Sequence, residues 1–362
     1  MEIGVFLPVG NNGWLISKSS PQYMPTYDLN KTVVQRAEAH GLDFALSMIK
    51  LRGFGGETGF WDHALDSFTL TAALAAVTER IRLYASAPVL ALPPAIAARM
   101  AATIDAIAPG RAGVNIVTGW APAEYAQMGL WPGDAHFVDR YARAAEYVTV
   151  LKQLWSEGRS NFRGAFYAMD DCVLSPRPAS GRIHVLAAGQ SGAGTRFAAE
   201  HADGNFILGS GVNTPLALSA ATAALAGHAR ESGRDVGAFA LFMIIADETD
   251  EAAQAKWRDY HDHADHAALR YVAAQTAGDE HADASSTAKT VVLPEGAVNL
   301  NMGTLVGAYR TVARMLDRIG GVPGVRGVIL VFDDFLEGVE RFGTRIQPLM
   351  ESRAPFRGDR DG

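Results

Sequence analysis

Short apolar runs alternate along the whole chain with longer amphipathic segments rich in alanine. The first run predicts a strand over 3–9, and the next segment predicts a helix over 29–40, with Val33, Val34 and Ala37 at helical spacing. The same pattern predicts further strands over 44–47, 81–87, 114–118, 183–187, 205–208, 238–246 and 325–332. It predicts further helices over 67–78, 93–106, 138–155, 193–201, 215–231, 248–273, 303–319 and 335–350.

Strict alternation of strands and helices predicts a parallel sheet, and eight such units favour an α/β fold of the closed (β/α)8 TIM-barrel type. An open doubly wound sheet remains the alternative, because strand order cannot be read from a sequence. Residues 158–172 hold aromatic residues and glycines without helical period, which predicts a hairpin insertion after the fourth strand. The polar stretch 278–298 predicts a second insertion after the seventh strand. We expect one domain over 1–362, with a frayed tail over 351–362.

Composition narrows the class of protein. The chain carries a net charge of −7 without a basic block, which argues against a nucleic-acid surface. Its single cysteine, Cys172, excludes a disulfide within one chain and a cysteine-rich metal site, and fits a reducing cytoplasm. The start of the chain is predicted to be a strand and not a signal peptide. No apolar run reaches the roughly 18 residues of a membrane helix, so we expect a cytoplasmic protein without a membrane partner.

The richest candidate chemistry follows the fourth predicted strand, at the end of a barrel where active sites lie. Asn115 interrupts an otherwise apolar strand, and a buried amide needs a hydrogen-bond partner. Aromatic residues such as Trp120 and Tyr141 can stack on a flat ring, and Arg140 can bind a phosphate in bidentate fashion. The alternative is that the tryptophan belongs to the core and that Glu124 is a solvated charge.

Three other loops contribute weaker signals. Lys50 follows the second strand and forms either a wall for an anionic or planar ligand or a solvated basic turn. Ser86 ends the third strand, where its hydroxyl faces the barrel mouth or bonds to backbone. The glycine-rich stretch 188–194 leads into a helix whose N-terminus favours a phosphate, with Ser191 alternatively a simple helix cap. Its glycine spacing is not that of the dinucleotide fingerprint.

Two polar clusters give little evidence of a functional site. The histidines at 261, 263 and 266 do not match the HExxH zinc helix, so we interpret them as a solvated face and expect no metal. The pair Asp333 and Asp334 precedes an apolar helix, and a helix cap is favoured there over a general base or a metal ligand. The residues alone therefore indicate a barrel with an aromatic cleft and an anion site. This suits a flat phosphorylated cofactor such as FMN but does not name a reaction.

Several long segments together carry a resemblance that covers almost the whole chain. They are residues 10–17, 44–56, 113–115, 117–120, 131–134, 299–305, 332–335 and 345–350. On these segments the chain resembles the bacterial-luciferase-like flavin monooxygenases, and within them the group that opens the pyrimidine ring.

The resemblance implies a barrel with FMN at the carboxyl ends of its strands. It implies ring opening of uracil, and of thymine, by reduced FMN and O₂ to a ureidoacrylate-type product. A separate NADH-dependent flavin reductase would supply the reduced FMN, and the chain would form a homo-oligomer, a dimer or a tetramer. The competing hypotheses are a related FMN monooxygenase for a sulfonate, an aldehyde or a halogenated aromatic, and a non-catalytic flavin-binding protein or deazaflavin reductase.

The resemblance also implies roles for individual residues. The positions that match flavin-binding positions are Ile49, Lys50, Asn115, Glu124, Arg140, Tyr141 and Ser191. Asn115 would also lie near the place where oxygen reacts. Leu46 and Trp120 would line the oxygen or substrate pocket. Ser86 would belong to the oxygen pocket with them, and it stands where threonine is expected in relatives, so it keeps a hydroxyl and loses a methyl group from the packing of that pocket.

Overall fold

Eight parallel strands form the closed barrel that the alternation predicts. The computed structural model describes residues 1–276 and 298–353. The barrel strands are β1 (Glu2–Phe6), β2 (Phe44–Ser47), β3 (Arg82–Pro88), β4 (Ala112–Val117), β7 (His184–Ala188), β8 (Gly204–Leu208), β9 (Gly237–Asp247) and β11 (Val325–Phe332). Each strand pairs in parallel with the next, and β11 pairs with β1, which closes the ring. The closed barrel is therefore confirmed over the open sheet.

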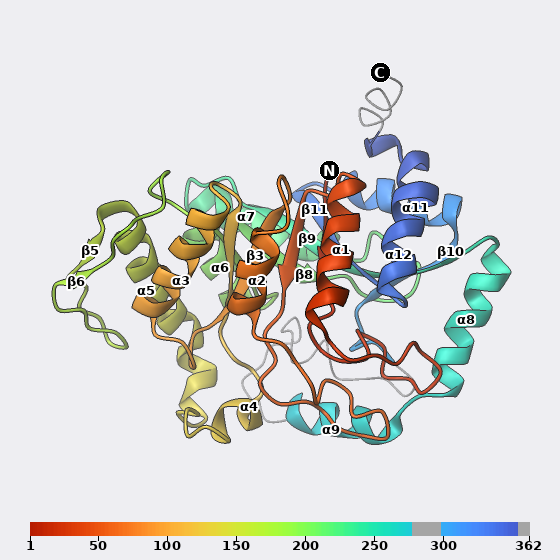
Figure 1. The fold of residues 1–362 in the computed structure, drawn as a ribbon, viewed down its shortest axis with the longest axis horizontal. Coiled ribbons are helices and arrows are strands. Elements are labelled where there is room, and N and C mark those ends of the chain that lie inside the picture. The colour runs from red at the N-terminus through yellow and green to blue at the C-terminus, as the bar shows by residue number, and fades with distance from the viewer. Residues whose placement is uncertain (277–297, 354–362) are drawn as a thin grey trace.

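Helices surround the barrel, and α4 and α9 both lie at the same end of it (Figure 1). The helices are α1 (Tyr27–Ala39), α2 (Ser67–Ala75), α3 (Pro94–Ile107), α4 (Pro122–Ala126), α5 (Ala135–Glu157), α6 (Gly192–His201), α7 (Ser219–Glu231), α8 (Asp250–Asp262), α9 (His266–Thr276), α11 (Tyr309–Gly320) and α12 (Phe335–Arg341). The chain continues from α12 through a π-helical turn over Phe342–Ile346 and a 3₁₀ turn over Gln347–Leu349. The short antiparallel pair β5 (Arg159–Ser160) and β6 (Cys172–Val173) lies where the sequence predicts a hairpin.

The helix predicted over 303–319 is wrong in its first half. Residues Gly303–Ala308 form strand β10, and α11 begins only at Tyr309. These residues form a strand and not a helix because β9 is longer than its neighbours. Phe242 to Asp247 extend beyond β8, and β10 pairs with that exposed edge in parallel. Five of the six β10 residues are buried, and this long-range pairing outweighs the local helical spacing.

The single helix predicted over 248–273 is broken into α8 and α9. At the break, the N–H of Lys18 donates to the carbonyl of His263 (2.9 Å), and the N–H of Asp265 donates to the carbonyl of Ile16 (3.0 Å). The loop after β1 thus pairs with the backbone that the break releases. Asp265 then begins α9, because its carboxylate accepts from the N–H of Ala268 (3.1 Å).

The end of the chain stays packed further than its composition indicates. The sequence predicts a frayed tail from residue 351, yet Arg353 is buried and its guanidinium donates to Asp43 (2.9 Å). The chain is therefore ordered against the barrel as far as residue 353. Asp334 caps α12 by accepting from the N–H of Glu337 (2.9 Å), as predicted. The polar segment 278–298 lies outside the described residues except for Val298.

Gly56 allows the loop after β2 to approach the α8–α9 junction closely. Its φ is +81°, and a Cβ there would lie 2.5 and 2.6 Å from the carboxylate oxygens of Asp265. Asp265 is buried and binds the N–H and hydroxyl of Thr58 (2.8 and 2.9 Å), so it has little room to move.

We therefore predict that Gly56→Ala lowers the free energy of unfolding by about 2 kcal/mol or more, from backbone strain plus steric overlap. Gly55→Ala is the matched control, because Gly55 also has positive φ (+65°) but no atom lies within 4 Å of the position that its methyl group would take. It should cost about 1 kcal/mol. Equal losses in urea denaturation would contradict the proposed overlap with Asp265.

Candidate active site

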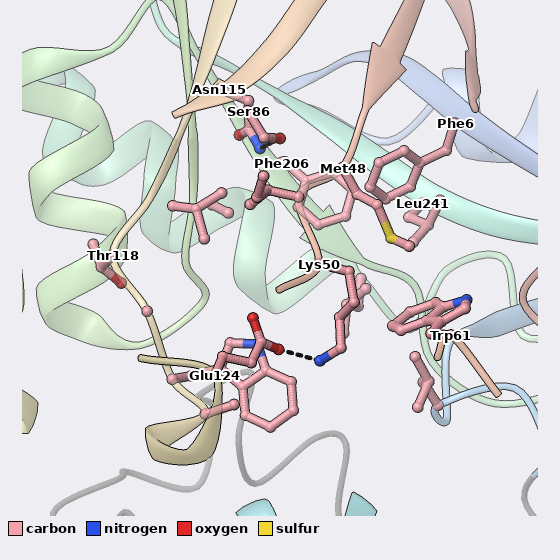
Figure 2. A pocket seen from close by; sticks show the side chains of 18 of the residues that line it. Phe6, Met48, Lys50, Trp61, Ser86, Asn115, Thr118, Glu124, Phe206 and Leu241 are labelled. Atoms are coloured by element: carbon pink, nitrogen blue, oxygen red, sulfur yellow. Dashed lines mark hydrogen bonds and ion pairs between the residues drawn. The ribbon is translucent and has the colours of Figure 1, made fainter. Parts of the chain in front are cut away.

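A cavity lies where the carboxyl ends of the barrel strands meet the loops that follow them. Its volume is about 200 Å³, and its walls are mainly apolar. Figure 2 shows that Asn115 and Ser86 lie together on one side, whereas Lys50 and Glu124 point toward each other on the other side. Eight of the predicted site residues line this one cavity: Ile49, Lys50, Ser86, Asn115, Trp120, Glu124, Arg140 and Tyr141.

The inner wall of the cavity carries a network of buried hydrogen bonds. Asn115 on β4 pairs in register with Ser86 on β3, and its Nδ2 donates to Ser86 Oγ (3.0 Å). Ser86 Oγ in turn donates to the carbonyl of Ser47 on β2 (2.7 Å). Ser67, at the first turn of α2, accepts from the N–H of Ser86 (2.8 Å). Asn115 Oδ1 is buried and has no hydrogen-bond partner within the described residues.

The opposite wall holds a buried ion pair among aromatic rings. Lys50 Nζ is paired with Glu124 Oε1 and lies 3.8 Å from the ring centroid of Phe54. The rings of Trp61 and Trp120 are each 5.7 Å from the same Nζ. Burial lowers the pKa of Lys50, and the charge of Glu124 and its hydrogen bond oppose that shift. The pair gives this wall fixed polarity inside an otherwise apolar pocket.

The third part of the site joins α5 to the start of α6. Arg140 and Tyr141 are adjacent on α5, and the Tyr141 hydroxyl lies 3.5 Å from Ser191 Oγ. Ser191 caps α6 by accepting from the N–H of Gly194 (3.0 Å), which is the role that the sequence offers as the alternative to a phosphate contact. A Cβ on Gly194 would lie 2.6 Å from the Tyr141 hydroxyl, so only glycine lets this tyrosine reach the helix N-terminus. An arginine, a hydroxyl and a helix N-terminus together suit a phosphate.

Two predicted residues stand back from the cavity. Leu46 is fully buried in β2, and within the described chain it does not line the cavity wall. Ser191 is likewise not among the described residues that line the cavity, and its Oγ lies 3.5 Å from the hydroxyl of Tyr141, which does. The functional roles that the resemblance implies for these two residues stay predictions.

Sequence reasoning missed several apolar residues of the pocket. Phe6 ends β1, Trp61 follows β2, and Phe206 and Leu241 lie on β8 and β9. Each is ordinary as a core residue in its own segment, and only barrel closure brings the four together. Leu300 and Met302 also line the cavity. A signal existed for them, since residues 299–305 are among the segments that carry the resemblance.

His136 holds the loop that carries Trp120. Its Nε2 donates to the carbonyls of Thr118 (2.9 Å) and Gly119 (3.1 Å), which requires the proton on that nitrogen. Burial lowers the pKa of His136, while these two carbonyl contacts raise it and the positive charge of Arg143 lowers it further. The neutral ring is therefore the form that the fold stabilises.

This predicts a pH dependence with a definite sign. Because the folded pKa lies below that of the unfolded chain, His136 favours folding at neutral pH and loses that contribution as the pH falls from about 6.5 through the folded pKa. His136→Gln keeps an amide donor and removes the titration. Its free energy of unfolding should therefore change less than that of the parent between about pH 7 and about pH 5. Parallel profiles in urea denaturation would contradict the assignment.

A family model decides how the barrel and its pocket are classified. The model described as "Luciferase-like monooxygenase" matches residues 1–319. The chain belongs to this family. Curated relatives are close to it: Pyrimidine monooxygenase RutA of Caulobacter segnis is 59% identical over 353 residues, covering 98% of this chain and 100% of that protein. The protein of that name from Bradyrhizobium sp. is 60% identical over 354 residues, covering 98% of each chain.

Solved structures share the fold at much lower identity. A riboflavin lyase (RcaE), crystallised with modified FMN and riboflavin, matches with a TM-score of 0.83 at 20% identity, over 98% of this chain and 92% of that one. The EDTA monooxygenase EmoA from Chelativorans matches with a TM-score of 0.81 at 18% identity, over 98% and 94%. These likenesses support the luciferase-like barrel. Among the helices in the described part of the chain, none has the length and apolarity needed to cross a membrane.

Proposed function

We propose that this chain is an FMN-dependent pyrimidine monooxygenase, which opens the ring of uracil or thymine to a ureidoacrylate-type product with reduced FMN and O₂. The observation that carries the proposal is the 58–60% identity to proteins named Pyrimidine monooxygenase RutA over 98% of this chain. The matched stretch takes in nearly the whole chain and is not confined to the barrel scaffold or to one motif. The fold alone would leave the substrate open, because one barrel hosts many chemistries.

The residues present fit a flavin mononucleotide. The cavity is mainly apolar and has aromatic walls, which suits a flat ring system. Asn115 Oδ1 is a buried acceptor that lacks a partner within the described residues, and such a group calls for a donor from a ligand. Arg140, Tyr141 and the N-terminus of α6 would hold the phosphate. Ile49 and Lys50 would flank the ring from the loop after β2.

When bound, reduced FMN supplies the two electrons that make O₂ reactive toward the pyrimidine. The chain's own residues bind the cofactor, orient the pyrimidine and exclude water. Phe6, Trp61 and Phe206 provide apolar walls that keep bulk water from the reacting groups. Lys50 and Glu124 are fixed charges that can orient a neutral pyrimidine with its alternating donors and acceptors.

The source of the reduced cofactor is part of the proposal. We infer that a separate NADH-dependent flavin reductase supplies reduced FMN, that the two proteins work in the cytoplasm, and that the chain assembles as a homo-oligomer. FMN reduced by light should then support turnover without any reductase, whereas NADH and oxidised FMN should not. Turnover with NADH and FMN alone would overturn the need for a partner.

The deciding experiment is product analysis. The purified chain, a flavin reductase, NADH, FMN and uracil are incubated in air, and the products are separated by mass spectrometry. We expect uracil to be consumed and a ureidoacrylate-type product to appear only when all components are present. If uracil persists, oxygen uptake with a sulfonate, an aldehyde or a halogenated aromatic tests the other monooxygenase hypothesis. If no substrate raises oxygen uptake, a non-catalytic flavin-binding role is favoured.

A further inference from the structure

The hydrogen bonds of Ser86 fix which end of the Asn115 amide serves a ligand. A serine hydroxyl has one proton to donate. Ser86 Oγ lies 2.7 Å from the carbonyl of Ser47, an atom that can only accept. The proton of Ser86 is therefore committed to Ser47, and the atom of Asn115 that lies 3.0 Å away must be a donor. The amide nitrogen satisfies this requirement, and the amide oxygen does not.

The same contacts exclude the reversed amide. If the Asn115 side chain turned over, its oxygen would face Ser86 Oγ, and two acceptors would compete for one proton. An unsatisfied buried polar group costs about 1–3 kcal/mol. Ser67 holds the geometry from behind, because its hydroxyl accepts from the N–H of Ser86 (2.8 Å) and lies within 3.1 Å of the Ser47 carbonyl. All four side chains are buried, so water does not relieve the conflict.

We infer that Ser86, braced by Ser67 and the Ser47 carbonyl, is a positioning residue that holds Asn115 Oδ1 as an acceptor for the N–H groups that a flavin gains on reduction. Oxidised flavin has acceptor nitrogens at N5 in its central ring and at N1 in the adjoining ring, and two-electron reduction to the neutral hydroquinone turns both into N–H donors. An acceptor fixed at the cavity wall therefore favours the reduced cofactor. The inference rests on the proposed function only in taking flavin as the ligand.

This changes the role assigned to Ser86. The resemblance places its hydroxyl in the oxygen pocket, yet its proton is directed to Ser47 and one of its lone pairs receives Asn115. The hydroxyl of Ser86 thus uses its proton and one lone pair in hydrogen bonds within the protein. Threonine at this position would keep the hydroxyl and its two bonds, so the serine preserves the orienting function that a threonine would perform.

The test compares two variants of the same shape. Ser86→Thr and Ser86→Val add the same bulk, and only the threonine can donate to Ser47 and accept from Asn115. Binding of oxidised and of reduced FMN is titrated without oxygen, and the ratio of the two dissociation constants is the readout. We expect the parent and Ser86→Thr to prefer reduced FMN. In Ser86→Val the preference should fall about tenfold, the worth of one hydrogen bond, and the midpoint potential of bound FMN should fall by about 30 mV.

A second comparison separates positioning from direct contact. Asn115→Leu removes the acceptor and should lower the preference by itself. Adding Ser86→Val to Asn115→Leu should then change the ratio no further, because Ser86 acts only through Asn115. If both valine variants are too unstable to purify, Ser86→Ala is measured with and without Asn115→Leu. Equal ratios for the threonine and valine variants, or additive effects with Asn115→Leu, would overturn the inference.

The outcome is independent of the substrate. If the threonine and valine variants differ as expected while no pyrimidine is consumed, the positioning role stands and the proposed substrate fails. If uracil is opened and the two variants bind both forms of FMN alike, the proposed function stands and the positioning role fails.

Discussion

Replacing Asn115 with alanine should lower turnover by about 10²-fold or more, the loss found when a preorganised polar group is removed from an active site. Its amide is the polar group at the inner wall of the cavity whose oxygen lacks a partner among the described residues. The affinity for FMN should fall less, by about tenfold, because Arg140 and the other residues proposed to contact the cofactor remain. Steady-state oxygen uptake at saturating reduced FMN, together with FMN titration, measures both effects.

Asn205 offers a matched control for this change. It is also an asparagine fully buried in a barrel strand, β8, and its Nδ2 donates to the carbonyl of Gly189 (2.9 Å). A Cβ on Gly189 would lie 2.7 Å from the Tyr141 hydroxyl, so Gly189 lies on the side of the site proposed to hold the phosphate. Asn205→Ala should therefore weaken FMN binding at least as much as turnover, the reverse of Asn115→Ala. Survival of turnover in Asn115→Ala would show that this strand does not serve the reaction.

The barrel and the centre of the site were predictable because their signals are local. Alternation of strands and helices is a repeated pattern, and Asn115 is conspicuous as an amide within an apolar strand. Lys50 and Glu124 are 74 positions apart, so their pairing was not readable from either segment. The enclosure of Lys50 by Phe54 was not readable either, because a buried and a solvated basic residue after a strand give the same sequence pattern.

The failures share one physical cause, which is competition from distant backbone. Residues 303–308 have helical neighbours, but the free edge of β9 captures them as a strand. The break at Asp265 likewise depends on the loop near Ile16. This loop supplies hydrogen-bond partners for backbone groups that would otherwise pair within a continuous helix. Local propensity is a weak preference, and tertiary pairing at a barrel mouth overrides it.

Removing one charge of the Lys50–Glu124 pair should destabilise the fold more than removing both charges. Both side chains are buried, so deleting one charge leaves the other without compensation. We predict that Glu124→Gln or Lys50→Met each lowers the free energy of unfolding by about 3 kcal/mol, and that the double variant Lys50→Met/Glu124→Gln recovers much of that loss. The coupling is measured by urea denaturation of all four proteins.

The exposed pair of Lys18 and Glu57, 3.3 Å apart, is the control, and Glu57→Gln should change stability by less than about 1 kcal/mol.

Glu124→Gln should also change how the stability of the protein depends on pH. Without Glu124, the pKa of Lys50 falls further below that of the unfolded chain. The folded state then binds fewer protons than the unfolded state up to about pH 10.4, so its stability should rise more steeply with pH than that of the parent. Purely additive losses and an unchanged profile would show that the two charges stabilise the pocket independently, without acting as a pair.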